Sequence, residues 1–433
     1  MNIIPRDQHC ISRKNISDSA LKVMSRLRKG GFQAYLVGGA VRDLLRGAHP
    51  KDFDVATDAT PEAVNELFRN SRIIGRRFRI VHVRFGREII EVTTFRGHHD
   101  STPDTGPGKG ASKHHSQQSA SGLLLRDNVY GTLAEDAARR DLTINALYYD
   151  SEKFEVFDQV DGLEDMAKQQ IRIIGDPDQR YTEDPVRMLR VLRFAAKLSF
   201  GIAPDTAAAI PRCAHLLEQI PSARLFDEFL KLFLGGYAAA TLDQLIQHDL
   251  LRYLFPESCI ALEEHPTGQA LVEAAMVSTD VRIAADKPVT PAFILAALLW
   301  PAVDNAFQRR KAGDEPPMVA IHGAGQDAIA AAAQHLSIPR RFSQPMREIW
   351  EFQLRLQRKT GRKALELLEH RRFRAAYDFL LLREQAGEET DGLGQWWTEV
   401  QTLSTAEREE KMASKGRRNR PGRNRTRRPK QTE

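Results

Sequence analysis

The sequence predicts an α+β N-terminal head with a small mixed or antiparallel sheet, followed by an all-α neck and body and a disordered basic tail. Three observations support this fold class. Helix and strand patterns alternate in the first third of the chain, almost purely helical patterns follow, and a run of Lys and Arg closes the sequence. The composition, 42% hydrophobic and 28% charged over 433 residues, excludes a collagen-like, disulfide-framed or wholly disordered protein.

The changes in pattern also place the expected domain boundaries. We expect a head over residues 1–155, a neck over 156–240, a helical body over 241–404 and a tail over 405–433. Within the head, residues 100–122 are rich in Gly, Ser and Pro and predict a flexible loop.

The elements of the head can be justified in order. Apolar residues at helical spacing predict a helix over 16–31, with Ser17 as its N-cap and Gly30-Gly31 as its end. Thr60 and Pro61 predict the start of a helix over 61–70. The other expected elements are strands at 32–37 and 51–57, a short helix at 40–47, a hairpin of strands at 78–86 and 87–95, and a last strand pair at 154–160 and 171–175.

The charge is concentrated at the C-terminus. Residues 411–433 hold ten Lys or Arg and one Glu, so the preceding 410 residues carry a net charge of −3 within a total of +6. Such a run predicts a disordered arm that binds polyanions, and nucleic acid is favoured over anionic lipid or an acidic protein partner.

The remaining features of composition indicate a cytoplasmic protein. The three cysteines, Cys10, Cys213 and Cys259, stand far apart, which disfavours a zinc site or disulfide frame and fits a reducing cytosol. The longest apolar run, residues 291–303, is shorter than the ~20 residues that span a bilayer, and the first residues show no signal peptide. We therefore expect no membrane association.

Carboxylates near a glycine pair are the first candidate site. Gly38 and Gly39 lie between an expected strand and helix, where backbone N–H groups can approach a phosphate, although most such pairs are simply turns. Asp52 and Asp54 should project from the same face of the next strand, and Glu91 adds a carboxylate on a later one. Paired carboxylates of this kind are suitable ligands for Mg²⁺. In the alternative interpretation, Asp52 and Asp54 are solvated residues at the end of a strand and Glu91 forms a salt bridge at the rim of the sheet.

The order of these features resembles that of the polymerase-β type nucleotidyltransferases. The resemblance implies two Mg²⁺ (or Mn²⁺) ions held by carboxylates. One activates a 3′-hydroxyl and the other carries the triphosphate and stabilises the leaving pyrophosphate, so that no side-chain nucleophile is needed.

Two further blocks narrow the resemblance. The sequence RRDLTINA from Arg139 resembles a motif of the tRNA nucleotidyltransferase and poly(A) polymerase family, and EDPVRMLR from Glu183 resembles its base-reading EDxxR motif. Taken alone, each could be a helix start with charged residues beside it. The resemblance implies that Gly38, Gly39 and Arg42 grip the triphosphate, and that Arg140, Asp184, Arg187 and Arg190 hold the nucleotide. Asp184 is also a good helix cap, with Pro185 at the first helical position.

The third essential carboxylate is left open between two residues. The family resemblance favours Asp141 as the essential partner of Asp52 and Asp54. The position of Glu91 on a strand instead favours Glu91 as the carboxylate that binds the metal.

The chain resembles the bacterial poly(A) polymerase branch of this family over about residues 9–400. The resemblance is carried by residues 72–86 and 95–99, and the arginine-rich tail is also typical of that branch. One difference is Ala40, which stands where that branch is expected to have a third glycine. The resemblance implies template-independent transfer of AMP from ATP to RNA 3′ ends, among them those of mRNA, decay intermediates and tRNA. It also implies that the neck binds the nucleotide base and RNA and that the body binds RNA. We expect a monomer that could dock RNA-decay or RNA-chaperone proteins. A CCA-adding enzyme and a non-catalytic RNA-binding protein are the alternatives.

Overall fold

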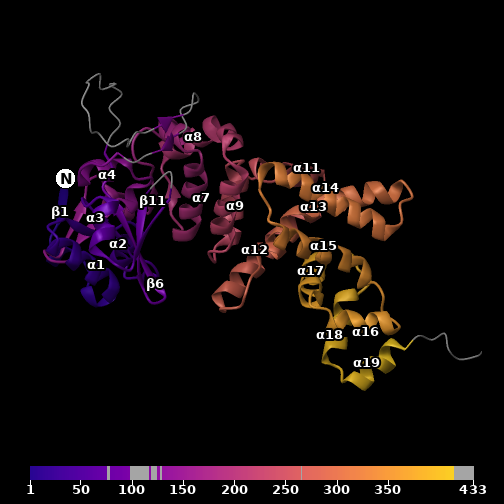
Figure 1. The fold of residues 1–433 in the computed structure, drawn as a ribbon. Coiled ribbons are helices and arrows are strands. Elements are labelled where there is room, and N and C mark those ends of the chain that lie inside the picture. The colour runs from indigo at the N-terminus through magenta and orange to yellow at the C-terminus, as the bar shows by residue number, and fades with distance from the viewer. Residues whose placement is uncertain (76–78, 98–116, 119–123, 127–128, 265, 414–433) are drawn as a thin grey trace, which may run out of the picture. The chain divides into compact units, whose positions relative to one another are not determined.

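The computed structural model describes residues 1–75, 79–97, 117–118, 124–126, 129–264 and 266–413 (Figure 1). The chain forms two compact units, Met1–Tyr253 and Leu254–Glu433. The predicted flexible loop at 100–122 lies outside the described residues except for Gln117 and Gln118, and so does the tail from residue 414 onward.

The first unit is built around a mixed sheet. Among the described residues this sheet has eight strands in the order β1-β10-β9-β2-β3-β6-β5-β4. Its strands are β1 (Asn2–Ile4), β2 (Ala34–Val37), β3 (Asp54–Thr57), β4 (Ser71–Ile74), β5 (Ile80–Phe85), β6 (Glu88–Thr94), β9 (Leu147–Asp150) and β10 (Glu155–Asp158). In this described sheet β3 and β6 are the parallel pair and the other neighbours are antiparallel. The predicted mixed sheet is confirmed, although it is larger than expected.

The helices of the head begin where their capping residues predict. Helix α1 (Asp18–Lys29) starts after Ser17, whose side chain accepts from the N–H of Ser19, and it ends at Gly30. Helix α3 (Pro61–Leu67) starts after Thr60 with Pro61 in its first turn. The other head helices are α2 (Gly39–Leu45), α4 (Leu133–Arg139) and α5 (Gly162–Ala167), with short 3₁₀ turns η1 (Arg6–Gln8), η2 (Arg13–Asn15) and η3 (Thr143–Asn145).

Buried residues of α1, α2 and α3 pack on the apolar side chains of the sheet and form the main core of the head. Examples are Val23, Val41, Val55 and Val92, which are all almost fully buried. Packing of this kind makes the sheet a rigid support for the residues at the ends of β2 and β3.

The last predicted strand pair is wrong. Residues 171–175 do not pair with 154–160; instead β10 lies between β9 and β1, while β11 (Gln170–Ile171) pairs in parallel with β12 (Gly201–Ile202). Strands β1, β4 and β9 were not expected, because three or four residues give too short an alternation to identify a strand. A further short pair is β7 (Gln117–Gln118) with β8 (Leu124–Arg126).

Helices complete the first unit. They are α6 (Pro177–Glu183), α7 (Val186–Leu198), α8 (Pro204–Cys213), α9 (Ser222–Phe233) and α10 (Ala238–Gln247), with 3₁₀ turns η4 (Ala214–Gln219) and η5 (Leu251–Tyr253). Helix α7 packs against α6, α9 and α10 and also against β11 and β12, so several elements hold it in place.

The second unit is helical in its described part, as predicted for the body. Its helices are α11 (Pro256–Glu264), α12 (Pro266–Ala284), α13 (Pro291–Ala312), α14 (Pro317–His335), α15 (Arg340–Arg355), α16 (Arg362–Glu369), α17 (Phe373–Gln385), α18 (Leu393–Thr402) and α19 (Thr405–Met412). Within the described ranges, no helix is both long and apolar enough to cross a membrane.

The first residues of the expected disordered tail are helical. Residues 405–412 form α19, which has a capping box of Ser404 and Glu407. Met412 is fully buried in a core that includes Trp397, and its carbonyl oxygen accepts from the N–H of Gly361 at 2.7 Å. The buried side chain of Met412 and this backbone hydrogen bond therefore tie this end of α19 to the body.

Candidate active site

The turn between β2 and α2 brings Gly38 close to Arg140. Gly38 has a φ of +75°, a conformation that favours glycine, and its N–H donates to the carbonyl oxygen of Leu147 at 3.1 Å. A Cβ atom on Gly38 would lie 3.6 Å from Nη1 of Arg140 and 3.7 Å from the carbonyl oxygen of Asn145. The turn therefore needs glycine and lies directly against the RRDLTINA segment. Gly39 follows as the first residue of α2.

Asp54 and Glu91 are neighbours on the parallel strands. Asp54 is the first residue of β3, and the register pairs it with Glu91 of β6. Asp52 is exposed two residues earlier, separated from Asp54 by the buried Phe53. The side chain of Glu91 is 47% exposed, and its Oε1 lies 3.2 Å from Nε2 of His82. The charges of Glu91 and Asp52 thus both act on Asp54 at the start of β3.

The electrostatics of Asp54 fit a divalent cation. Burial, together with the negative charges of Glu91 and Asp52, raises the pKa of Asp54 to about 6, although Arg140 opposes the shift. A hard cation with oxygen ligands, such as Mg²⁺ or Mn²⁺, would offset this excess negative charge. Over the described residues, no group of three or more His, Cys, Asp and Glu side chains could hold a metal ion by itself. An ion here would therefore also need oxygen atoms from substrate or water, and the metal-ligand assignment of Asp52, Asp54 and Glu91 stays a prediction.

Arg140 is fixed by two partners at the end of α4. Its Nε and Nη2 donate to Oδ2 of Asp136 at 3.2 and 3.1 Å, and Nε also donates to the hydroxyl of Tyr148 at 2.9 Å. The Tyr148 hydroxyl in turn donates to the same Asp136 oxygen at 2.6 Å. Burial alone would lower the pKa of Arg140, but Tyr148 and Asp136 outweigh burial and raise it, so the guanidinium stays charged beside Gly38. Arg140 closes α4 rather than starting a helix.

Asp141 is joined to α7. Nε of Arg190 donates to Oδ2 of Asp141 at 2.7 Å, Nη2 of Arg190 contacts the same oxygen, and the N–H of Leu142 donates to Oδ1 at 2.8 Å. Burial alone would raise the pKa of Asp141, but Arg190 outweighs burial and holds the pKa well below its usual range. Asp141 is therefore a paired anion, whereas Asp54 lies among other carboxylates.

Arg180, which the sequence did not single out, connects the same segments. Its Nη1 donates to Oε2 of Glu183 at 2.9 Å, and its Nη2 donates to the carbonyl oxygens of Arg139, at 2.7 Å, and Arg140. Arg187 donates to Glu183 and to the carbonyl oxygen of Arg180, both at 2.8 Å. Burial, followed by the charge of Arg187, lowers the pKa of Arg180 to about 10. An arginine three residues before Glu183 gives no pattern that distinguishes it from a surface residue.

The predicted capping role of Asp184 is wrong. Asp184 ends α6, and its Oδ2 accepts from Nη2 of Arg224 on α9 at 2.7 Å, while α7 begins at Val186 without a side-chain cap. The tertiary ion pair takes the carboxylate that a helix cap would use. Arg187 and Arg190 lie on one face of α7, as their spacing predicts.

Arg42 lies inside the protein. Arg42 is only 1% exposed. Its Nη1 donates to Oδ1 of Asn145 at 2.6 Å, and its Nε and Nη2 donate to Oδ1 of Asp43 at 2.8 and 2.7 Å. Its guanidinium also lies over the ring of Phe194, 5.2 Å from the ring centroid. The structure thus places Arg42 as a link between α2, the RRDLTINA segment and α7. Asn145 is the member of that motif that Arg42 contacts.

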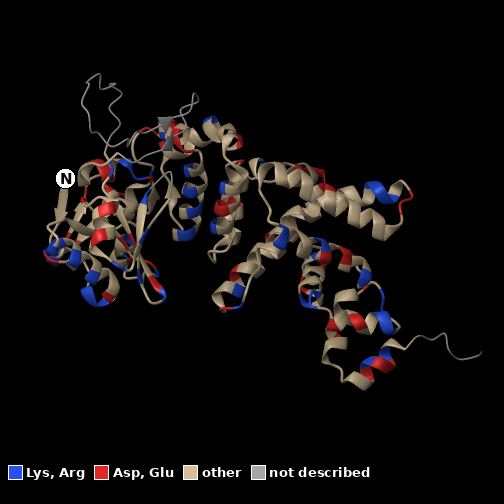
Figure 2. Cartoon of the chain, viewed as in Figure 1, with Lys and Arg blue, Asp and Glu red and all other residues tan. Residues whose placement is uncertain are grey.

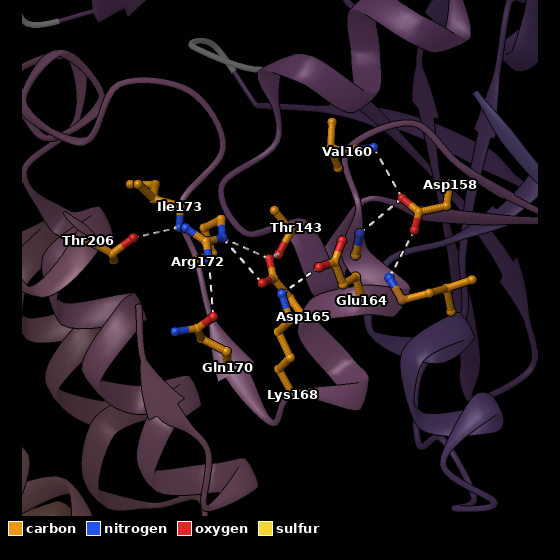
Figure 3. A network of polar contacts seen from close by, with 12 residues as sticks. Thr143, Asp158, Val160, Glu164, Asp165, Lys168, Gln170, Arg172, Ile173 and Thr206 are labelled. Atoms are coloured by element: carbon orange, nitrogen blue, oxygen red, sulfur yellow. Dashed lines mark hydrogen bonds and ion pairs between the residues drawn. The ribbon is translucent and has the colours of Figure 1, made fainter. Parts of the chain in front are cut away.

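A buried polar network holds the other side of the RRDLTINA segment (Figure 3). Oδ2 of Asp165 accepts from the hydroxyl of Thr143 at 2.7 Å, and both oxygens of Asp165 accept from Nε of Arg172 at 3.2 Å. The N–H of Thr143 donates to the carbonyl oxygen of Arg172 at 3.1 Å. Asp158 accepts from three N–H donors before and in the first turn of α5, those of Val160, Gly162 and Leu163. The sequence did not indicate these carboxylates, because their partners lie on other elements.

Known protein families match this chain over its head, over the helical segment that follows and over its C-terminal part. Three family models match: "Poly A polymerase head domain" over residues 34–172, "Probable RNA and SrmB-binding site of polymerase A" over residues 199–261, and "Polymerase A arginine-rich C-terminus" over residues 313–432. The chain is 48% identical to poly(A) polymerase I of Salmonella typhimurium over 412 residues, which cover 94% of this chain and 87% of the relative.

More distant relatives share the fold. A CCA-adding enzyme of Leuconostoc citreum is 38% identical over 235 residues, which cover 54% of each chain. The solved structure of the Thermotoga maritima CCA-adding enzyme complexed with tRNA superposes with a TM-score of 0.59 at 16% identity, covering 92% of this chain and 85% of that one. The identity and coverage of the poly(A) polymerase match are decisive: the chain belongs to the bacterial poly(A) polymerase family of RNA adenylyltransferases.

Proposed function

We propose that this chain adds AMP from ATP to RNA 3′ ends without a template, with release of pyrophosphate. One observation carries the proposal: Asp54 and Glu91 face each other beside the charged Arg140, in a chain whose similarity to a poly(A) polymerase I covers 94% of its length. The similarity to a CCA-adding enzyme covers 54%, so no feature favours CCA addition as a second function.

The carboxylates would hold the metal ions. The family implies a nucleotide substrate and a divalent metal, and we propose Mg²⁺ or Mn²⁺ on Asp52 and Asp54, with Glu91 next to them. When bound, such ions lower the pKa of an attacking hydroxyl and stabilise the charge on leaving phosphate oxygens. Asp54 favours the ion because its carboxylate, raised in pKa by burial, Glu91 and Asp52, gains a positive neighbour.

The arginines would hold the nucleotide. Arg140 is charged and partly exposed beside the Gly38 turn, which suits the triphosphate. Arg187 and Arg190 are expected to face the nucleobase and ribose, with Asp141 keeping Arg190 in place. Arg42 is buried, so we assign it a positioning role through Asn145 in place of the triphosphate contact expected from the sequence.

The two candidates for the third carboxylate then have different tasks. Glu91 lies next to Asp54 in register and contributes to its raised pKa, which supports Glu91 as the metal-side carboxylate. Asp141 is paired with Arg190, which supports a role in orienting the nucleotide-binding arginine.

The partners follow from the reaction. The substrates would be ATP and RNA 3′ ends, from mRNA, decay intermediates and tRNA, in the cytoplasm. One matching family model is described as a probable RNA and SrmB-binding site, so the segment 199–261 is where we expect RNA or an RNA-chaperone protein to dock. We expect RNA-decay proteins as further partners and a monomeric enzyme.

A nucleotide-selection assay tests this function. The purified chain would be incubated with Mg²⁺, an unstructured RNA oligonucleotide and each nucleoside triphosphate singly, and 3′ extension followed on a denaturing gel. We expect a long ladder with ATP alone. Addition confined to tRNA-like ends and requiring CTP before ATP would replace the proposal with CCA addition, and RNA binding without extension would replace it with a binding protein.

A further inference from the structure

The C-terminal half of α7 carries basic residues that the roles above do not use. Arg193 and Lys197 follow Arg190 at intervals of three and four residues, so the three side chains lie along one face of the helix. Figure 2 shows Lys and Arg repeating along α7. Lys51 belongs to the same group in space, because its charge acts on Lys197, and it directly precedes Asp52.

These three cations differ from their neighbours in having no carboxylate partner. Arg187 is paired with Glu183 and Arg190 with Asp141, whereas within the described ranges neither Lys51, Arg193 nor Lys197 forms an ion pair. In addition, Nε of Arg193 is buried and finds no hydrogen-bond partner among the described residues. A buried donor without a partner costs stability, which is a reason to expect a ligand that accepts from it.

The positions of the side chains show a concentration of positive charge. Two guanidinium groups contact the ring of Phe194, that of Arg193 at 4.6 Å and that of Arg42 at 5.2 Å from the ring centroid. The nearby carboxylate of Asp43 already accepts two hydrogen bonds from Arg42. Burial, followed by the charges of Arg42, Arg193 and Lys51, lowers the pKa of Lys197, although Asp43 opposes the shift. The cations therefore influence one another, and the carboxylate that acts on Lys197, that of Asp43, is already paired with Arg42.

We propose that Lys51, Arg193 and Lys197 bind a backbone phosphate near the 3′ end of the RNA substrate. The proposal rests on the function proposed above, since it names how that site holds its RNA. Lys51 is adjacent to Asp52, where the RNA 3′-hydroxyl must arrive, while Arg140, Arg187 and Arg190 are assigned to the incoming nucleotide. A guanidinium with a free donor and two ammonium groups suit a phosphate, and contacts to phosphate carry no base preference.

The test compares two double variants that lose the same charge. One is Arg193→Gln with Lys197→Gln. The matched control is Lys22→Gln with Arg26→Gln on α1, where Arg26 also stacks on a phenylalanine, Phe68, at 5.3 Å. The full chain is used for both, so any contribution of the basic tail to RNA affinity is the same and cancels. A third variant, Lys51→Gln, changes an exposed side chain and checks the cluster without altering α7.

Affinity for a short single-stranded RNA is measured without ATP at several salt concentrations. A lost phosphate contact reduces the slope of log affinity against log salt by about 0.7, so we expect the α7 double variant to reduce the slope by up to about 0.7 and the control to leave it unchanged. In the extension assay, the KM for RNA should rise about tenfold or more while the KM for ATP stays within about twofold; Lys51→Gln should change the KM for RNA in the same direction.

Two results would overturn the proposal. RNA affinity and salt slope equal to those of the control would show that the cluster does not bind RNA. A raised KM for ATP with unchanged RNA affinity would assign the cluster to the triphosphate. Because binding is measured without catalysis, failure of the wild-type chain to add nucleotides would refute the proposed function separately and leave the binding comparison intact.

Discussion

Asp54 and Glu91 stand opposite each other on β3 and β6, the parallel neighbours in the described part of the eight-stranded sheet. Burial and the negative charges of Glu91 and Asp52 raise the pKa of Asp54 to about 6, because both burial and like charge disfavour ionisation. The sheet thus holds negative charge close together before any substrate arrives. Several predictions about stability and catalysis depend on this relationship and on the ion pairs around it.

Asp54→Asn should stabilise the metal-free protein at pH 8. Because the pKa of Asp54 in the folded protein, about 6, is above its ordinary value of 3.8, its contribution to stability is fully present below about pH 4 and is lost as the pH rises through 6. The substitution should therefore raise the free energy of unfolding at pH 8 by about 1–3 kcal/mol and change it little at pH 4. Thermal unfolding in EDTA at both pH values measures this. Adding Mg²⁺ should raise Tm of the wild type but not of the variant, and equal Mg²⁺ shifts would contradict the metal assignment.

Glu91→Gln and Asp141→Asn should affect different kinetic constants. Loss of the Glu91 charge should reduce kcat roughly 10–100-fold and raise the Mg²⁺ requirement, with little change in Tm because the side chain is 47% exposed. Loss of the Asp141 charge should raise the KM for ATP, leave the Mg²⁺ requirement unchanged and lower Tm, because Arg190 loses its partner. Titrations of Mg²⁺ and of ATP separate the two effects, and the reverse pattern would exchange their roles.

Arg42→Lys should destabilise the fold even though the charge is kept. Lysine cannot contact Asn145, Asp43 and the Phe194 ring together, so we expect a loss of about 2–3 kcal/mol and a lower Tm. The KM for ATP should also rise, because Asn145 loses its partner. Arg46→Lys, an exposed change at the end of the same helix, is the control. An unchanged Tm for Arg42→Lys would show that Arg42 is not the structural link described here.

Removal of the basic tail should be made after Ala413. Residues 414–433 contain nine Lys or Arg, whereas Met412 is buried in the body core and must be kept. We expect the truncated chain to keep its Tm, bind RNA more weakly and show a flatter dependence of log affinity on log salt. A truncation from residue 411 should lower Tm as well. An unchanged salt slope would exclude the tail from RNA binding.

Much of the fold and site could be predicted from the sequence because local signals agreed with tertiary structure. Ser17, Thr60 and Pro61 marked helix starts that the structure has, and Asp52, Asp54 and Glu91 were expected near one another. What could not be predicted depends on partners far apart in the chain. Arg180 holds carbonyl oxygens about forty residues away, and Asp184 binds Arg224 forty residues later. The strand pairing of 171–175 failed for the same reason.

We propose that Asp52 and Asp54 hold the metal ions that the transfer needs, while other residues hold the RNA. The most direct measurement is 3′ extension of an RNA oligonucleotide with ATP and Mg²⁺ by the wild type and by Asp52→Asn with Asp54→Asn, together with RNA affinity measured without ATP. We expect a long ladder for the wild type, no extension for the double variant, and RNA affinity that is equal within about twofold. Extension by the double variant at the wild-type rate would contradict the claim.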